Sequence, residues 1–137
     1  MKKSRGFSLL ELLIVVAIIL IIATIAIPSL LRSRQAANES GAVVNLRTIN
    51  TAQVTYMSGP GGNYGMLSDL ITAGLLDSRF NSAVSGYSYV IVASGADYTA
   101  TASASSANTG RFGYYSAPDG VVRYSAGTGV TPGAPVQ

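Results

Sequence analysis

The chain has 137 residues, of which 48% are hydrophobic and only 11% are charged, whereas an average soluble protein carries about 25% charged residues. It contains no cysteine and no histidine, which excludes a disulfide framework, a thiolate metal site and histidine-based catalysis. No catalytic residue, cofactor or metal is expected. Lys2, Lys3 and Arg5 account for the net charge of +3. In the rest of the chain the charges of six arginines balance those of six acidic residues. No basic patch remains for a nucleic acid.

The N-terminal part combines a basic leader with a long apolar stretch. Residues 1–6, MKKSRG, form the leader, and residues 7–31 follow as an almost uninterrupted apolar run. About 20 helical residues span the roughly 30 Å hydrocarbon core of a bilayer. Residues 7–31 are therefore predicted to be a transmembrane helix, with the cationic leader on the cytoplasmic side.

Residues 32–57 are predicted to continue this helix with a single apolar face. The apolar positions recur at spacings of three and four, and they are Ala42, Val43, Leu46, Ile49, Ala52 and Tyr56. The polar positions fall mostly on the opposite side, and they are Asn38, Asn45, Thr48, Thr51 and Thr55. This pattern is typical of a helix that packs on a core. Pro28 and Gly41 are its predicted bends, because proline removes a backbone donor and glycine loosens the turn.

Residues 58–125 are predicted to form a small globular domain. A glycine-rich loop ends the long helix, a short helix is expected over 67–76, and alternating sequences predict two hairpins over 87–103 and 111–124. The alternating tyrosines are expected to pack on the long helix. Residues 126–137 are predicted to be disordered. The fold class is thus α+β, with a long N-terminal helix packed against a small antiparallel sheet.

The run KKSRGFSLLELLIVVAIILIIATIAIP, residues 2–28, resembles the N-terminus of type IV prepilins and of the pseudopilins of type II secretion. In that family a membrane peptidase cuts after a glycine and N-methylates the new first residue, usually phenylalanine. The resemblance implies cleavage between Gly6 and Phe7, with methylation of Phe7. It also matches Glu11 to the glutamate that the family places four residues after that phenylalanine, and Pro28 to a frequent proline.

Glu11 is unusual on physical grounds as well, because a charged carboxylate at the centre of a membrane helix costs about 2.5–3.5 kcal/mol and less near an end. The twelve leucine, isoleucine and valine residues from Leu12 to Ile27 offset this by roughly 4–7 kcal/mol. Inside a filament Glu11 would need a cationic partner, and cleavage would create one as the free amine of Phe7. The resemblance implies that this amine belongs to a neighbouring subunit. A pair within one chain, at i,i+4, is the alternative.

These implications predict a structural subunit of a type IV pilus. The precursor is expected in the inner (cytoplasmic) membrane, and the assembled homo-oligomeric, helical filament at the cell surface. The implied partners are the lipid bilayer, a prepilin peptidase/methyltransferase, and an inner-membrane assembly platform with its ATPase. Two alternatives remain: a pseudopilin or minor pilin of a type II secretion or DNA-uptake system, and a membrane-tethered binding module that does not polymerise.

Overall fold

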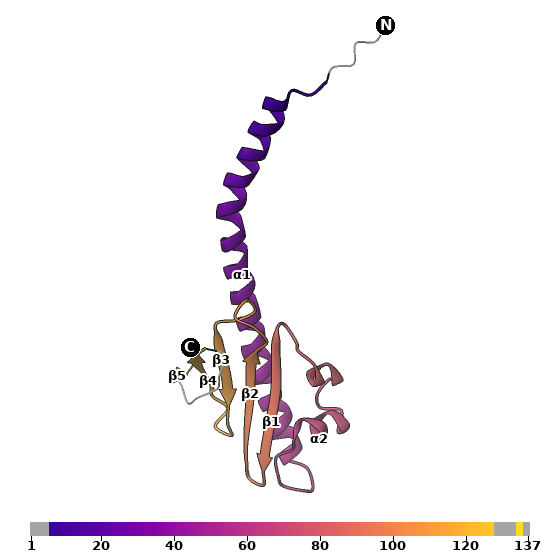
Figure 1. Cartoon of the computed structure of the whole chain (residues 1–137). Coiled ribbons are helices and arrows are strands. Elements are labelled where there is room, and N and C mark those ends of the chain that lie inside the picture. Colours follow the sequence, from indigo (N-terminus) through magenta and orange to yellow (C-terminus); the bar gives the residue numbers. More distant parts are fainter. Residues whose placement is uncertain (1–5, 128–133, 136–137) are drawn as a thin grey trace. The chain divides into compact units, whose positions relative to one another are not determined.

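The computed structural model, which describes residues 6–127 and 134–135, contains one long helix followed by an antiparallel sheet (Figure 1). Helix α1 runs without a break from Leu9 to Met57, which confirms the predicted long helix. The chain forms two compact units, Met1–Ser33 and Arg34–Gln137. The boundary between the units falls inside α1.

In the first unit, α1 is apolar on all sides and exposed. From Gly6 to Ser33 every side chain is exposed except that of Ala23, which is half-buried. A helix that is hydrophobic all round belongs in a large core or in a membrane, and this unit offers no core of its own. Pro28 lies inside the continuous helix, so the predicted bend at this residue stays a prediction.

The second unit consists of the last part of α1, two short helices and a five-stranded sheet of order β1-β2-β3-β4-β5, in which all neighbours are antiparallel. The elements after α1 are α2 (Leu67–Thr72), η1 (Ser78–Asn81), β1 (Tyr87–Ser94), β2 (Asp97–Ala104), β3 (Phe112–Ser116), β4 (Val122–Ala126) and β5 (Ala134–Pro135). Both predicted hairpins are confirmed, as β1–β2 and β3–β4.

Two boundaries differ from the sequence prediction. The short helix ends at Thr72 instead of residue 76, because Gly74 adopts a φ of 71° and the backbone N–H groups of Leu75 and Leu76 return to the carbonyl of Leu70. This is a common way of closing a helix. The prediction of disorder from residue 126 is wrong at residues 126–127 and 134–135. Ala126 ends strand β4, the N–H of Gly127 donates to the carbonyl of Arg111 at 3.1 Å, and residues 134–135 pair with β4 as strand β5. Residues 128–133 and 136–137 of that segment lie outside the described residues.

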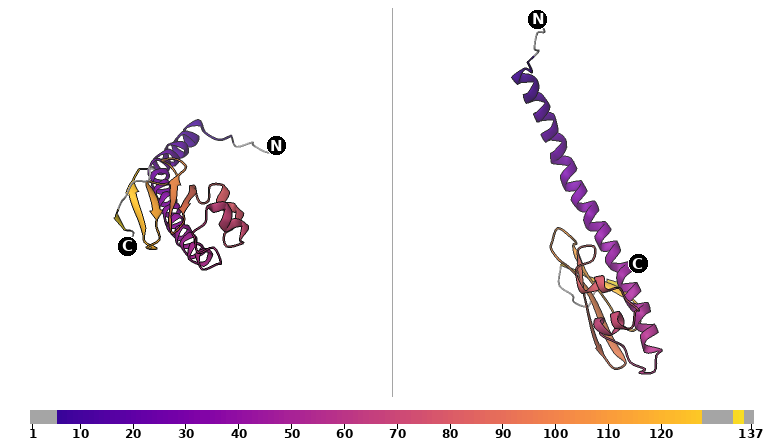
Figure 2. Two further views of the ribbon diagram at one scale, coloured as in Figure 1. Left: turned by 90° about the horizontal axis from the view of Figure 1, so that it is seen from below. Right: turned by 90° about the vertical axis from the view of Figure 1, so that its right-hand side faces the viewer.

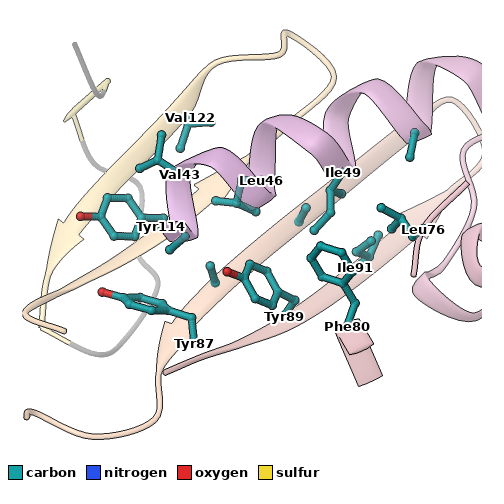
Figure 3. Close-up of a cluster of buried hydrophobic side chains, with 14 of the residues drawn as sticks. Val43, Leu46, Ile49, Leu76, Phe80, Tyr87, Tyr89, Ile91, Tyr114 and Val122 are labelled. Carbon is teal, nitrogen blue, oxygen red and sulfur yellow. The ribbon is translucent and has the colours of Figure 1, made fainter. Parts of the chain in front are cut away.

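The core of the second unit lies between α1 and one face of the sheet (Figures 2 and 3). Helix α1 contributes side chains such as Leu46 and Ile49, which are fully buried. Strand β2 contributes Ala100 and Ala102, whose small side chains let the helix approach the sheet closely. The buried tyrosines confirm that these residues pack on the helix, and they are Tyr87, Tyr89, Tyr98 and Tyr114.

The face of α1 that packs on the sheet also carries buried polar side chains, whose burial the sequence did not predict. Asn45, expected on the solvent side, is 8% exposed and donates a hydrogen bond to the hydroxyl of Tyr89 at 2.9 Å. Asn50 accepts hydrogen bonds from Tyr98 at 2.9 Å and Ser116 at 2.6 Å. The expected separation into an apolar and a polar face is therefore wrong at Asn45, and at both positions the sheet supplies partners that satisfy the buried amides.

Candidate functional site

The bond between Gly6 and Phe7 lies at the start of the described chain, just ahead of α1 (Figure 1). Gly6 is exposed, and a side chain at its position would meet no atom within 4 Å. Phe7 is 76% exposed. Neither residue belongs to a helix or strand, so the peptide bond between them is free of regular hydrogen bonding and open to a processing enzyme. Residues 1–5 of the predicted leader lie outside the described residues.

Glu11 occupies the first turn of α1 and is exposed. The first hydrogen bond of this turn runs from the N–H of Leu12 to the carbonyl of Ser8 at 3.2 Å. A carboxylate in a first turn interacts favourably with the positive end of the helix dipole. Among the described residues Glu11 makes no ion pair with another side chain.

The helix behind Glu11 meets the requirements for crossing a membrane by its length and composition. Its most apolar 18-residue stretch has a mean hydropathy of 3.1, and none of that stretch is buried. It is the one such helix in the part of the chain that the structure describes. Gly6, Phe7 and Glu11 therefore lie together at the N-terminal end of a candidate membrane span.

Gly41, the second predicted bend, lies apart from this segment and has a different environment. A side chain at Gly41 would come within 3.4 Å of Cβ and Oγ of Ser85 in the loop before β1. The glycine therefore allows this loop to pack closely on α1. The helix continues through Gly41 without interruption, and the predicted bend remains a prediction.

A polar cluster in the second unit, which the sequence did not predict, joins α1 to the loop between β2 and β3. Glu39 accepts hydrogen bonds from the backbone N–H, Nε and a terminal nitrogen of Arg111, at 2.8, 3.1 and 2.8 Å. Burial by itself raises the pKa of Glu39, but the bonds and charge of Arg111 outweigh it and hold the pKa below its usual value. Gln35 and Asn38 donate to the carbonyls of Ala107 and Thr109 in the same loop. The cluster is structural, because its side chains on α1 are hydrogen-bonded to the loop.

Metal binding finds no support in the described residues, which contain no group of three or more acidic side chains that could hold an ion. The loop aspartates serve other purposes. Asp119 forms an ion pair with Arg123 at 2.5 Å, and Asp77 accepts a hydrogen bond from the N–H of Arg79 at 2.7 Å, at the start of η1. An exposed apolar helix that is long enough to cross a membrane, preceded by an exposed Gly–Phe junction, instead points to the class of proteins with an N-terminal membrane anchor.

Comparisons with known proteins identify the family to which the chain belongs. Residues 1–27 match the family model of the prokaryotic N-terminal methylation motif. The chain is 33% identical over 135 residues to the type IV wide pilus major component PilA4 of Thermus thermophilus, which covers 98% of this chain and 97% of that protein. It is 46% identical over 56 residues to the type IV major pilin protein PilA of Myxococcus xanthus, a stretch that covers 41% of this chain but only 26% of that protein. No solved structure matches the chain. The chain belongs to the type IV pilin family.

Proposed function

We propose that this chain is the precursor of a type IV pilus subunit, and that cleavage of the Gly6–Phe7 bond makes it competent for assembly. The observation that carries the proposal is the exposed Gly6–Phe7 junction directly ahead of an apolar helix with Glu11 in its first turn. Similarity over nearly the whole length to a major pilus component supports the structural role.

In this proposal the apolar half of α1 holds the precursor in the inner membrane, with residues 1–6 on the cytoplasmic side. A prepilin peptidase removes the leader and methylates the new amine of Phe7. The helix then leaves the lipid and packs against the helices of other subunits in the filament. An assembly platform and its ATPase supply the energy that extracts the helix from the membrane.

The proposed partner of Glu11 is the terminal amine of Phe7 on a neighbouring subunit. Both charges lose water when the helices bundle, which is costly for either charge alone. Their attraction is much stronger in the dry helix bundle than in water. The pair would therefore fix the axial register of one subunit against the next.

A pseudopilin or minor pilin of a secretion or DNA-uptake system is the second candidate function. The N-terminal segment serves such a protein equally well. Both similar proteins are named major components of pili, and this favours the major subunit.

The test of the proposal is the mature N-terminus of filaments sheared from cells. We expect mass spectrometry to find a chain that begins with N-methylated Phe7. Gly6→Val should leave the precursor uncut, because the family's peptidase cuts after glycine. Gly61→Val is the matched control, since a side chain at Gly61 also meets no atom within 4 Å, and this variant should be processed normally. Surface filaments that retain residues 1–6, or normal processing of Gly6→Val, would contradict the proposal.

A further inference from the structure

In the part of the second unit that the structure describes, one acidic side chain has no partner. Two of its acidic side chains form ion pairs, Glu39 with Arg111 and Asp119 with Arg123. Asp69 accepts a hydrogen bond from the backbone N–H of Met66 at 2.8 Å, and Asp77 likewise caps η1. Among the described residues of this unit, Asp97 alone has a carboxylate with neither an ion pair nor a hydrogen bond. It is exposed at the turn between β1 and β2.

Among the described residues, the same unit leaves two exposed arginines of α1 without an ion pair, Arg34 near the start of the unit and Arg47 in the part of the helix that packs on the sheet. Arg47 is exposed and makes no ion pair with any described residue. It is the only charged residue of α1 between Ser40 and Met57. The arginines outside α1 differ from it, since Arg111 and Arg123 are paired and Arg79 lies 5.5 Å from the centre of the Phe80 ring.

Arg47 lies on a helix face that turns away from the core. We call it the outer helix face, and it consists of Val44, Arg47, Thr48, Thr51, Val54 and Thr55, all exposed. Val44 is 56% exposed and Val54 is 59% exposed. These positions repeat at spacings of three and four, as expected for one side of a helix. The opposite side holds the buried residues that contact the sheet (Figure 3).

The threonines of this face are already satisfied within the helix. The hydroxyls of Thr48, Thr51 and Thr55 donate to the carbonyls four residues earlier, at 3.1, 3.1 and 2.9 Å. Such back-bonded hydroxyls can be covered by another protein surface without leaving an unpaired donor. Arg47 is then the one group on the face whose burial would be costly, because a covered cation needs a carboxylate.

Building on the proposed function, we infer that the outer helix face is covered by a second copy of the chain in the filament, and that Arg47 of one copy pairs with Asp97 of the other. The two free charges are opposite in sign and lie on different elements, one on α1 and one at the β1–β2 turn. Such a contact joins two different surfaces, and repeating it generates an open helical filament. The face also belongs to the helix that carries the proposed assembly segment.

Charge reversal tests the pairing in cells that carry the pilus machinery. Arg47→Glu and Asp97→Arg should each lower the yield of sheared filaments by at least about tenfold, since losing one partner of a covered charge pair weakens association by that much or more. The double variant restores opposite charges and should return most of the wild-type yield. Both residues are exposed in the single chain, so the thermal unfolding of the extracted precursors should not change.

A matched pair of valines tests whether the face is covered at all. Val44 on the outer helix face and Val90 on the outward face of β1 are both 56% exposed. Val44→Lys should prevent assembly, because it places a second cation in the covered contact and this cation has no carboxylate to pair with. Val90→Lys should assemble like the wild type.

The inference is overturned if Arg47→Glu or Val44→Lys gives wild-type filament yield, or if the double variant stays as defective as the single ones. Processing at Gly6–Phe7 is read separately in every variant by N-terminal mass analysis. An uncut wild-type chain would contradict the proposed function, whereas cut and assembled Arg47→Glu subunits would contradict only this inference.

Discussion

Glu11 owes its proposed role to its position. A carboxylate in the first turn of an exposed helix is favourable in water, because the helix dipole and the solvent both stabilise its charge. Glu11 lies in an exposed apolar helix, and in the proposed filament the bundling of such helices would remove water from around this group. An unpaired charge there costs several kcal/mol. In the proposed function the same side chain therefore favours the first turn of the helix in water and requires a cationic partner in the filament.

We expect Glu11→Ala to separate processing from assembly. The scissile bond lies outside α1, so cleavage at Gly6–Phe7 should proceed as in the wild type. Filament yield should fall by more than about tenfold, because the terminal amine of the neighbour would be buried without a carboxylate. Quantitative mass spectrometry of the membrane and sheared fractions measures both steps. Ser8→Ala is the control for a nearby uncharged change and should assemble normally. Wild-type filament yield from Glu11→Ala would contradict the charge-pairing account.

At the scale of elements, the sequence predicts what depends on local pattern. Alternation of tyrosine and small residues correctly predicted β1 and β2, and a spacing of three and four correctly predicted the buried side of α1. The buried amides were missed because their partners are remote in sequence. Tyr98, Ser116 and Gly120 contact Asn50 from 48, 66 and 70 residues away. Only the paired sheet brings these groups to the helix, so no local periodicity signals them.

The N-terminal methylation motif was easier to predict than these contacts. Its signal is one continuous stretch of sequence, and the family model matches it over residues 1–27. The Glu39–Arg111 pair, in contrast, joins α1 to a loop 72 residues later. Either residue alone looks like an ordinary surface charge in the sequence, and nothing local marks them as a pair.

The Glu39–Arg111 pair should make the second unit sensitive to acid. The pKa of Glu39 is lowered in the folded state, so its stabilising contribution is present above the pKa of the unfolded chain, about 4.3. This contribution is lost as the pH falls through the folded-state value. We expect Glu39→Gln to lower the free energy of unfolding at pH 7 by about 1–2 kcal/mol, a modest figure since Arg111 is half-exposed.

Urea unfolding of the detergent-solubilised chain at pH 7 and pH 3.5 measures this effect. Glu39→Gln should lose less stability on acidification than the wild type. Asp119→Asn is the control, because Asp119 also has a lowered pKa but pairs at the exposed surface, where an ion pair contributes little. If Glu39→Gln kept the full acid sensitivity of the wild type, the pair would not be its source.

At the scale of the whole molecule, the two units differ in what stabilises them. Every residue of the buried hydrophobic core lies between Ala42 and Val122, inside the second unit. In the first unit the side chains of α1 are exposed, and their apolar surface has to be covered by lipid or by other subunits. The chain has no cysteine, so the second unit depends on non-covalent packing and on its buried hydrogen bonds.

A fragment of residues 34–137 should therefore fold without the first unit. It keeps the whole described core and the Glu39–Arg111 pair, and it omits the apolar stretch that would drive association. We expect a soluble monomer by sedimentation and a single cooperative urea transition by circular dichroism. Leu46→Ala in the same fragment is the control that links this transition to the core. Leu46 is fully buried, so the change should cost about 2–5 kcal/mol. A fragment that unfolds without cooperativity would mean that the second unit gains its order only from neighbouring subunits in the filament.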